Sequence, residues 1–130
     1  LQRIKDFCHK YDTDSDPEKL AESVQINFAS GSNLVLVVAI VKRYCVLGHF
    51  LAAIDQWFGK KFVTVLQFEI DKRSAINTDL LKAGLSAIQD WGRQQEAAQI
   101  RLLVSDPNIE RAFRIFYGFK HRRVQMSKEI

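Results

Sequence analysis

The stretch of residues 62–105 constrains the fold of this chain more than any other, because two strand patterns in it flank a helix pattern. Its first and last pieces are dense in apolar side chains: Val63, Val65, Leu66, Phe68 and Ile70, then Ile100, Leu102, Leu103 and Val104. β-Branched and aromatic runs of this length are typical of buried strands. Both pieces are therefore predicted to lie inside a sheet.

The segment between these two strands has the periodicity of an amphipathic helix. Apolar residues recur every three or four positions at Leu80, Leu81, Gly84, Leu85, Ile88 and Trp91. Asn77 or Thr78 can cap this helix, and Asp79 is favourable in its first turn. A strand, a crossover helix and a strand form a βαβ unit with parallel strands. The loop entering the helix can bind an anion, because free backbone N–H groups and the helix dipole converge there.

The rest of the chain predicts two helices and a hairpin before this unit, and a helix and a strand after it. Before the unit we expect a helix over residues 4–11, a second helix from the Asp16-Pro17 cap, and two strands over 34–42 and 45–53 joined by an Arg43-Tyr44 turn. After it we expect a helix from Asp106-Pro107 to Gly118 and a last strand over 124–126, continuing at most to Ile130. The predicted fold is one α+β domain over residues 1–130. It has a central mixed, mostly antiparallel sheet of about five strands and four flanking helices.

Composition narrows the classes of partner. The net charge of +4 is spread out, and its densest part is Lys120, His121, Arg122 and Arg123. This cluster is interpreted as a solvated strand face or as a site for phosphates, and nucleic acid is the weaker hypothesis because no aromatic residues interleave with the charges. No apolar run is long enough to span a membrane.

The cysteines and histidines do not form a metal-binding pattern. Cys8 and Cys45 each lie among apolar neighbours, so both are expected to be buried thiols of a cytoplasmic, reducing compartment. The three histidines are too scattered in the sequence to predict a metal site. Trp57 and Phe58 precede the third strand and are expected in the core, with the mouth of a pocket as the alternative.

The order of elements and the details of the second half resemble the GNAT superfamily of N-acetyltransferases. The resemblance covers residues 16–130. Asn108, an amphipathic helix, Gly118-Phe119 and a final strand with Met126 and Lys128 are similar to the family's Asn-rich turn, fourth helix and Gly-Phe ending. The resemblance implies acetyl-CoA as co-substrate, an amine as acceptor, and no metal.

The family's cofactor motif, Arg/Gln-x-x-Gly-x-Gly/Ala, falls on residues 72–77 of this chain. Lys72 takes the basic position, and Ala75 and Asn77 take the two glycine positions, so the motif is degenerate. In the family, backbone N–H groups of this loop hold the pyrophosphate of acetyl-CoA. The implied cofactor-binding residues are Phe68, Ile70, Lys72, Arg73, Ser74, Ala75, Ile76, Asn77, Thr78 and Asn108.

The resemblance also implies three catalytic tasks. Glu69 or Asp71, at the end of the third strand, would take the proton of the amine, directly or through water. A backbone N–H near residues 68–70 would bind the thioester carbonyl. The position of the family's tyrosine, which protonates the departing thiolate, holds Arg114, so Tyr117 is the substitute candidate. Each of these side chains also has a purely structural interpretation, as a solvated strand end or a packed helix end.

Two further departures concern the ends of the fold. The family has a strand before the first helix, and this sequence predicts none at that place. The family has two strands after Gly-Phe, and this sequence predicts one. A homodimer could cover the sheet edge that this leaves.

Three hypotheses of function follow. The first is an acetyl-CoA-dependent N-acetyltransferase, and the second is an inactive GNAT-like binding or assembly module, such as a virus-encoded structural protein. A nucleic-acid-binding domain is the third. Binding of acetyl-CoA separates the first two, because function lies in the site rather than in the fold.

Overall fold

The computed structural model describes residues 1–12, 14–31, 34–70, 78–102, 107–120, 126 and 128–130. The elements follow in the order α1 (Gln2–Tyr11), α2 (Pro17–Ala29), β1 (Val35–Lys42), β2 (Cys45–Trp57), β3 (Lys60–Ile70), α3 (Thr78–Gln94), β4 (Gln99–Leu102) and α4 (Pro107–Phe116). This is the predicted order as far as α4.

The four strands form one mixed sheet in the order β1-β2-β3-β4. β1 pairs with β2, and β2 with β3, in antiparallel fashion, while β3 and β4 are parallel. The predicted βαβ unit is therefore confirmed as β3-α3-β4, and so is the α+β class. The predicted fifth strand falls mainly on residues outside the described chain. Of its span, Met126 and residues 128–130 are described and have no strand structure.

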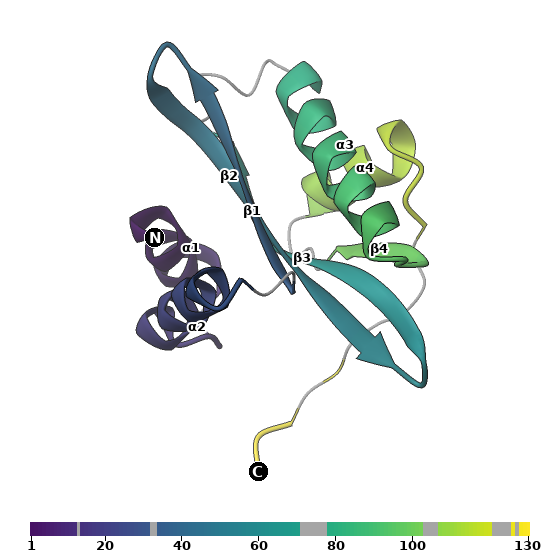
Figure 1. Cartoon of the computed structure of the whole chain (residues 1–130). Coiled ribbons are helices and arrows are strands. Elements are labelled where there is room, and N and C mark those ends of the chain that lie inside the picture. The colour runs from purple at the N-terminus through teal and green to yellow at the C-terminus, as the bar shows by residue number, and fades with distance from the viewer. Residues whose placement is uncertain (13, 32–33, 71–77, 103–106, 121–125, 127) are drawn as a thin grey trace.

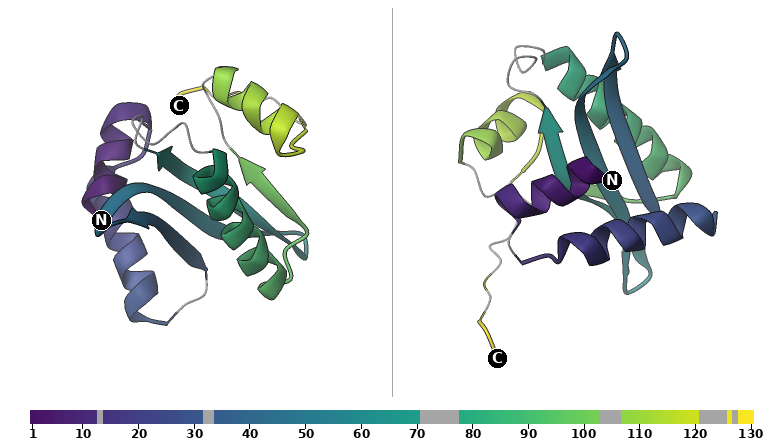
Figure 2. Two further views of the ribbon diagram at one scale, coloured as in Figure 1. Left: turned by 90° about the horizontal axis from the view of Figure 1, so that it is seen from above. Right: turned by 90° about the vertical axis from the view of Figure 1, so that its left-hand side faces the viewer.

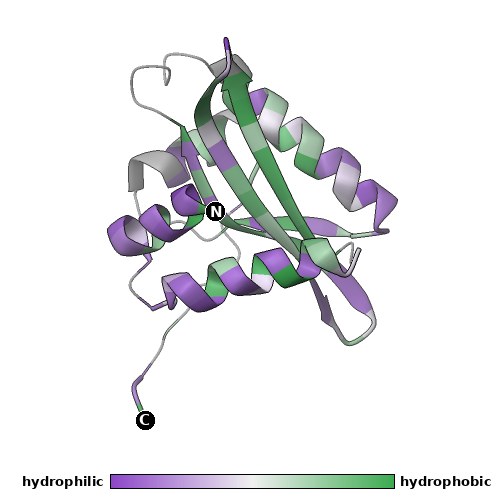
Figure 3. Ribbon diagram, turned by 60° about the vertical axis from the view of Figure 1, so that its left-hand side comes forward, coloured by the Kyte–Doolittle hydropathy of each residue, from purple (hydrophilic) through white to green (hydrophobic). Residues whose placement is uncertain are grey.

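Helices cover both faces of the sheet. α1 and α2 lie on one face, and α3 and α4 lie on the other (Figure 1), as the views from above and from the side also show (Figure 2). The larger core cluster packs α3 and α4 on the sheet, and its buried members are Ile40, Phe50, Ala52, Val63, Val65, Leu85, Ile88 and Phe113. A smaller cluster of Ile4, Val24 and Leu51 packs the first two helices on the opposite face. Hydrophobic residues accordingly run along the strands in Figure 3.

The predicted helix ends are confirmed at two places. The Asp16 side chain accepts hydrogen bonds from the backbone N–H groups of Glu18 and Lys19 at 3.0 and 3.2 Å, which satisfies donors that the first turn leaves free. At the other end of the chain, Gly118 has a φ of 71°. This left-handed residue lets the Phe119 N–H bond back to the Phe113 carbonyl at 3.3 Å and ends α4.

The expectation that Trp57 and Phe58 belong to the core is wrong. β2 does not end at Ala53 but continues to Trp57, and a two-residue turn of Phe58 and Gly59 connects it to β3. This hairpin projects beyond the helices (Figure 1), so no helix covers its tip. Trp57 and Phe58 are 55% and 93% exposed, and their rings stack on each other with centroids 5.9 Å apart.

The two cysteines differ in burial. Cys8, on the inner face of α1, is buried, as predicted, but Cys45 is exposed. Cys45 is the first residue of β2 and pairs with Lys42 next to the Arg43-Tyr44 turn, at the end of the sheet. Its apolar sequence neighbours belong to a strand end rather than to the core. The prediction that Cys45 is buried was therefore wrong. No helix of the described part of the chain is long and apolar enough to cross a membrane.

Candidate functional site

The last five residues of β3 form the centre of the candidate site. Within the described residues β4 pairs with β3 from Phe62 to Val65, and β3 continues to Ile70; residues 103–106, which follow β4, lie outside the described chain. Along residues 66–70 only β2 pairs with β3 among the described strands. The sequence predicts a backbone donor for the thioester carbonyl in this stretch.

A bulge at Leu66 determines which side chains point to which face here. Val65 pairs with Ala52 and Gln67 with Leu51, so Leu66 is an extra residue in β3. The bulge shifts the alternation of side chains by one position. Val63 and Val65 before the bulge, and Phe68 and Ile70 after it, all pack on the α3/α4 side.

Phe68 and Ile70, two predicted cofactor-binding residues, therefore lie at the edge of the larger core. The Phe68 ring stacks on Phe50 with centroids 6.0 Å apart and meets the edge of Phe113 at 5.2 Å. This packing fixes the end of β3 against α4. Their side chains are thus occupied in core packing, and a role of their backbone in cofactor binding stays a prediction.

Glu69, a predicted general base, lies on the opposite face, under α1. Its Oε1 accepts a hydrogen bond from Arg3 Nη2 at 3.5 Å, which forms a long ion pair. Its Oε2 is buried and has no hydrogen-bond partner among the described residues. This oxygen has an unused lone pair but is closed to solvent under α1.

Tyr117, the candidate acid, lies on the α3/α4 side. Its ring is half-buried and packs on Phe113 with centroids 5.4 Å apart. Because Phe113 itself packs on Phe68, Tyr117 and Glu69 are on opposite faces of β3. The described contacts do not bring the two side chains together.

The remaining predicted site residues surround this strand end in the sequence. Thr78 is the first residue of α3, and Asn108 is the second residue of α4. Asp71 and the predicted motif residues Lys72, Arg73, Ser74, Ala75, Ile76 and Asn77 lie outside the described residues. No group of three or more His, Cys, Asp or Glu side chains within the described ranges can hold a metal ion.

A buried polar network under α1 was not predicted from the sequence. Gln67 Nε2 donates to the Ile4 carbonyl at 3.2 Å and to Cys8 Sγ at 3.4 Å, while Gln67 Oε1 is 3.0 Å from His49 Nε2. Burial lowers the pKa of His49, so the ring is neutral at pH 7. Burial, followed by the Asp12 carboxylate, raises the pKa of the Cys8 thiol. The sequence signal for this network was an amide and an imidazole at inward positions of otherwise apolar strands.

Comparison with known proteins gives a fold but no sequence family. No protein-family model matches the chain, and no curated protein matches its sequence. Solved structures of acetyltransferases do match. Glucosamine-6-phosphate N-acetyltransferase from Arabidopsis thaliana has a TM-score of 0.68 at 16% identity, over 88% of this chain and 78% of that one. An acetyltransferase from Trypanosoma brucei has a TM-score of 0.68 at 14% identity, over 98% and 89%.

A third match is AAC(6′)-Iy in complex with a bisubstrate analogue, CoA-S-monomethyl-acetylneamine. Its TM-score is 0.73 at 16% identity, over 95% of this chain and 86% of that one. This chain has the GNAT fold. AAC(6′)-Iy is an aminoglycoside N-acetyltransferase that has also been solved in complex with CoA. At these identities the likeness establishes the fold and leaves the chemistry to the site.

Proposed function

We propose that this chain is an acetyl-CoA-dependent N-acetyltransferase of the cytoplasm. The observation that supports this most is the β3-α3-β4 unit of a GNAT-like fold. β3 ends at Ile70, and α3 begins eight residues later at Thr78. A helix N-terminus that follows a strand end suits a pyrophosphate, and a backbone N–H at the strand end suits a thioester carbonyl.

The proposed reaction is direct attack of an amine on the thioester. Glu69 or Asp71 takes a proton from the ammonium form of the acceptor; Glu69 does so through water, because its unpartnered Oε2 is buried under α1. The neutral nitrogen then forms a bond to the acetyl carbon, and a backbone N–H of residues 68–70 stabilises the oxyanion. The carbon–sulfur bond breaks, and the nitrogen loses its second proton to water, which leaves the neutral amide. Tyr117 or water protonates the CoA thiolate, whose pKa is near 8.5.

A transfer assay tests this proposal. Purified protein, acetyl-CoA and a panel of amines, including glucosamine 6-phosphate and aminoglycosides, should give acetylated product detectable by mass spectrometry. Glu69→Gln should lower kcat by about 10²–10⁴-fold with an unchanged fold, because general base catalysis is lost. Glu22→Gln, on the exposed face of α2, is the matched control and should keep full activity.

A second candidate is a non-catalytic binding or assembly module with the same fold. Two observations favour it. Ala75 and Asn77 replace the glycines of the cofactor motif, and Arg114, at the position of the family's tyrosine, forms an exposed ion pair with Glu110 at 3.2 Å. Such a module would neither bind acetyl-CoA nor respond to Glu69→Gln.

A further inference from the structure

The tip of the β2–β3 hairpin presents two large aromatic side chains to solvent. Phe58 is 93% exposed and Trp57 is 55% exposed, and their rings stack with centroids 5.9 Å apart. The hairpin projects beyond the helices (Figure 1), so the paired rings lie at the far end of an exposed arm. Single exposed apolar residues are normal, whereas two adjoining exposed rings indicate a surface that contacts something outside the fold.

The backbone of this turn is unfavourable for the residue that it carries. Phe58 and Gly59 have φ values of 50° and 79°, the left-handed geometry of a two-residue hairpin turn that favours Asn-Gly. Glycine adopts this geometry without strain, but a bulky side chain does not. Phe58 therefore works against the stability of the hairpin. Strain of this kind in an exposed turn indicates that the side chain has a use beyond the fold.

Two cations flank the rings, one on each face of the hairpin. Lys60 pairs directly with Trp57 and so shares its face, whereas Lys61 pairs with Gln56 and is on the other face. Asp55, the carboxylate nearest to the tip along the hairpin, lies two positions behind Trp57. The end of the arm is thus apolar, and the layer next to it is positively charged.

The size of this surface limits the kind of partner that it fits. An aromatic side chain buries about 250 Å² at most, whereas a stable protein interface takes about 800 Å² from each partner. Two partly exposed rings are therefore too small for a protein interface of their own. A lipid bilayer needs no complementary cleft, because its surface yields to an inserted ring. Aromatic rings are enriched at the boundary between membrane and water, and anionic headgroups attract lysines next to it.

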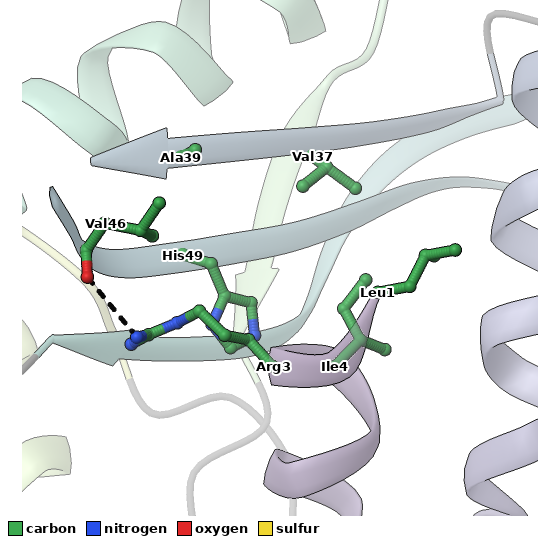
Figure 4. A pocket seen from close by; sticks show the side chains of 7 residues that line it. All are labelled: Leu1, Arg3, Ile4, Val37, Ala39, Val46 and His49. Atoms are coloured by element: carbon green, nitrogen blue, oxygen red, sulfur yellow. Dashed lines mark hydrogen bonds between the residues drawn. The ribbon is translucent and has the colours of Figure 1, made fainter. Parts of the chain in front are cut away.

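The apolar pocket under α1 does not offer a flat surface the same contact. It lies between α1, β1 and β2, and Leu1, Val37, Ala39 and Val46 are among its lining residues. Figure 4 shows the Arg3 side chain reaching from α1 to the Val46 carbonyl, at 3.5 Å. A bilayer surface cannot enter such a pocket, whereas it can receive a projecting tip.

We propose that the tip of the β2–β3 hairpin binds the surface of an anionic lipid bilayer. Phe58 and Trp57 enter the boundary between headgroups and acyl chains, and Lys60 and Lys61 contact the negative headgroups. This is binding to one leaflet, without any segment that crosses the bilayer. The inference does not depend on the proposed transferase activity.

Vesicle binding by the whole chain, without acetyl-CoA, tests this inference. Vesicles of phosphatidylcholine and phosphatidylserine at about 7:3 should sediment the protein, and phosphatidylcholine alone should bind at least about tenfold more weakly, because the two lysines lose their attraction. The emission of Trp57 should shift to shorter wavelength on binding, whereas Trp91, the other tryptophan, packs on the larger core. Equal binding to both vesicles, or binding of single-stranded DNA in place of vesicles, would overturn the proposal.

Two turn substitutions separate the hairpin tip from general adhesion of a basic protein. Phe58→Asn gives the favoured Asn-Gly turn, so it should raise the midpoint of urea unfolding while weakening binding to the anionic vesicles at least about tenfold. Tyr44→Asn is the matched control, because Tyr44 is also a fully exposed aromatic residue with a positive φ, in the turn at the other end of β2. It should bind these vesicles as the parent chain does. Unchanged binding by Phe58→Asn, or an equal loss in both variants, would contradict the assignment.

Discussion

Single residues under α1 show how burial changes side-chain chemistry in this protein. Gln67 joins Cys8, the Ile4 carbonyl and His49 in one network, and each group is inaccessible to water. Burial penalises the charged form of a thiol and of an imidazole alike. The neutral forms of Cys8 and His49 are therefore part of the folded state, and two predictions at the residue scale follow from this.

The two thiols should react at very different rates. Cys45 is exposed, while Cys8 is 1% exposed and burial raises its thiol pKa. Labelling with a chromogenic disulfide reagent at pH 8 should modify about one thiol per chain rapidly, and the second only in denaturant. Cys45→Ser, the control, should leave no fast phase. Two fast thiols in the native parent chain would contradict the buried position of Cys8.

The free energy of unfolding should decrease as the pH is lowered below 6.5, the unfolded-state pKa of His49. Burial lowers the folded-state pKa of His49, and the positive charges of Arg3 and the N-terminus lower it further. The hydrogen bond to Gln67 and the negative charge of Glu69 raise the pKa, without reversing the net shift. Between the two pKa values the unfolded chain binds a proton that the folded chain does not, so stability rises with pH there. The slope is at most about 1.4 kcal/mol per pH unit.

Urea unfolding at pH 7.5, 6.5 and 5.5 measures this effect. His49→Gln should flatten the pH dependence between 6.5 and 5.5, since glutamine does not titrate. His9→Gln, an exposed change on α1, should keep the slope of the parent chain. Identical slopes in both variants would mean that His49 is not held neutral.

At the scale of elements, the contact of α3 with the sheet depends on a missing side chain. A Cβ at Gly84 would overlap the ring of Phe50, which is buried and stacked on Phe68 and so cannot move aside. Gly84→Ala should lower the free energy of unfolding, because overpacking costs about 1–3 kcal/mol and the gain in helix propensity is about 1 kcal/mol. Denaturant midpoints should show this loss, whereas Ser86→Ala, exposed on the same helix, should cost nothing. A rise in the midpoint of Gly84→Ala would refute the close contact.

The β1–β2 turn carries backbone strain. Arg43 and Tyr44 have φ values of 49° and 66°, a left-handed conformation that costs a side-chain-bearing residue roughly 1–2 kcal/mol. Both side chains are exposed. Replacing the pair by Asn-Gly should raise the free energy of unfolding by about 1–2 kcal/mol, because these residues favour such turns. Replacement by Ala-Ala keeps the strain and should give no gain, so equal stability of the two double variants would contradict the turn geometry.

Elements could be predicted from the sequence wherever a local pattern specifies them. The periods of β3 and α3, the Asp16-Pro17 cap and Gly118 are all signals within a few residues, and the structure confirms them. β2 was predicted too short because Asp55 and Gln56 continue it as an exposed hairpin, where no apolar alternation is needed. The ion pair of Arg3 with Glu69 joins residues 66 positions apart. No local pattern contains such a contact, so the network under α1 was not predicted.

The whole molecule is a sheet with two differently equipped faces. The α3/α4 side buries an aromatic cluster behind the end of β3, and the α1 side holds the Arg3, His49 and Glu69 group. β1 and β4 are the outer strands of the described sheet. A dimer that covers one of these edges stays a prediction. The central claim is that the end of β3 and the following loop bind acetyl-CoA.

Calorimetric titration with acetyl-CoA, beside free CoA, tests that claim most directly. We predict micromolar binding by the parent chain. Lys72→Glu should abolish it, since it places a negative charge at the predicted pyrophosphate loop. Lys60→Glu, the same charge change on the exposed β2–β3 hairpin, should leave it intact. No binding up to millimolar acetyl-CoA, or equal binding by both variants, would contradict the acetyltransferase account and favour a binding module with this fold.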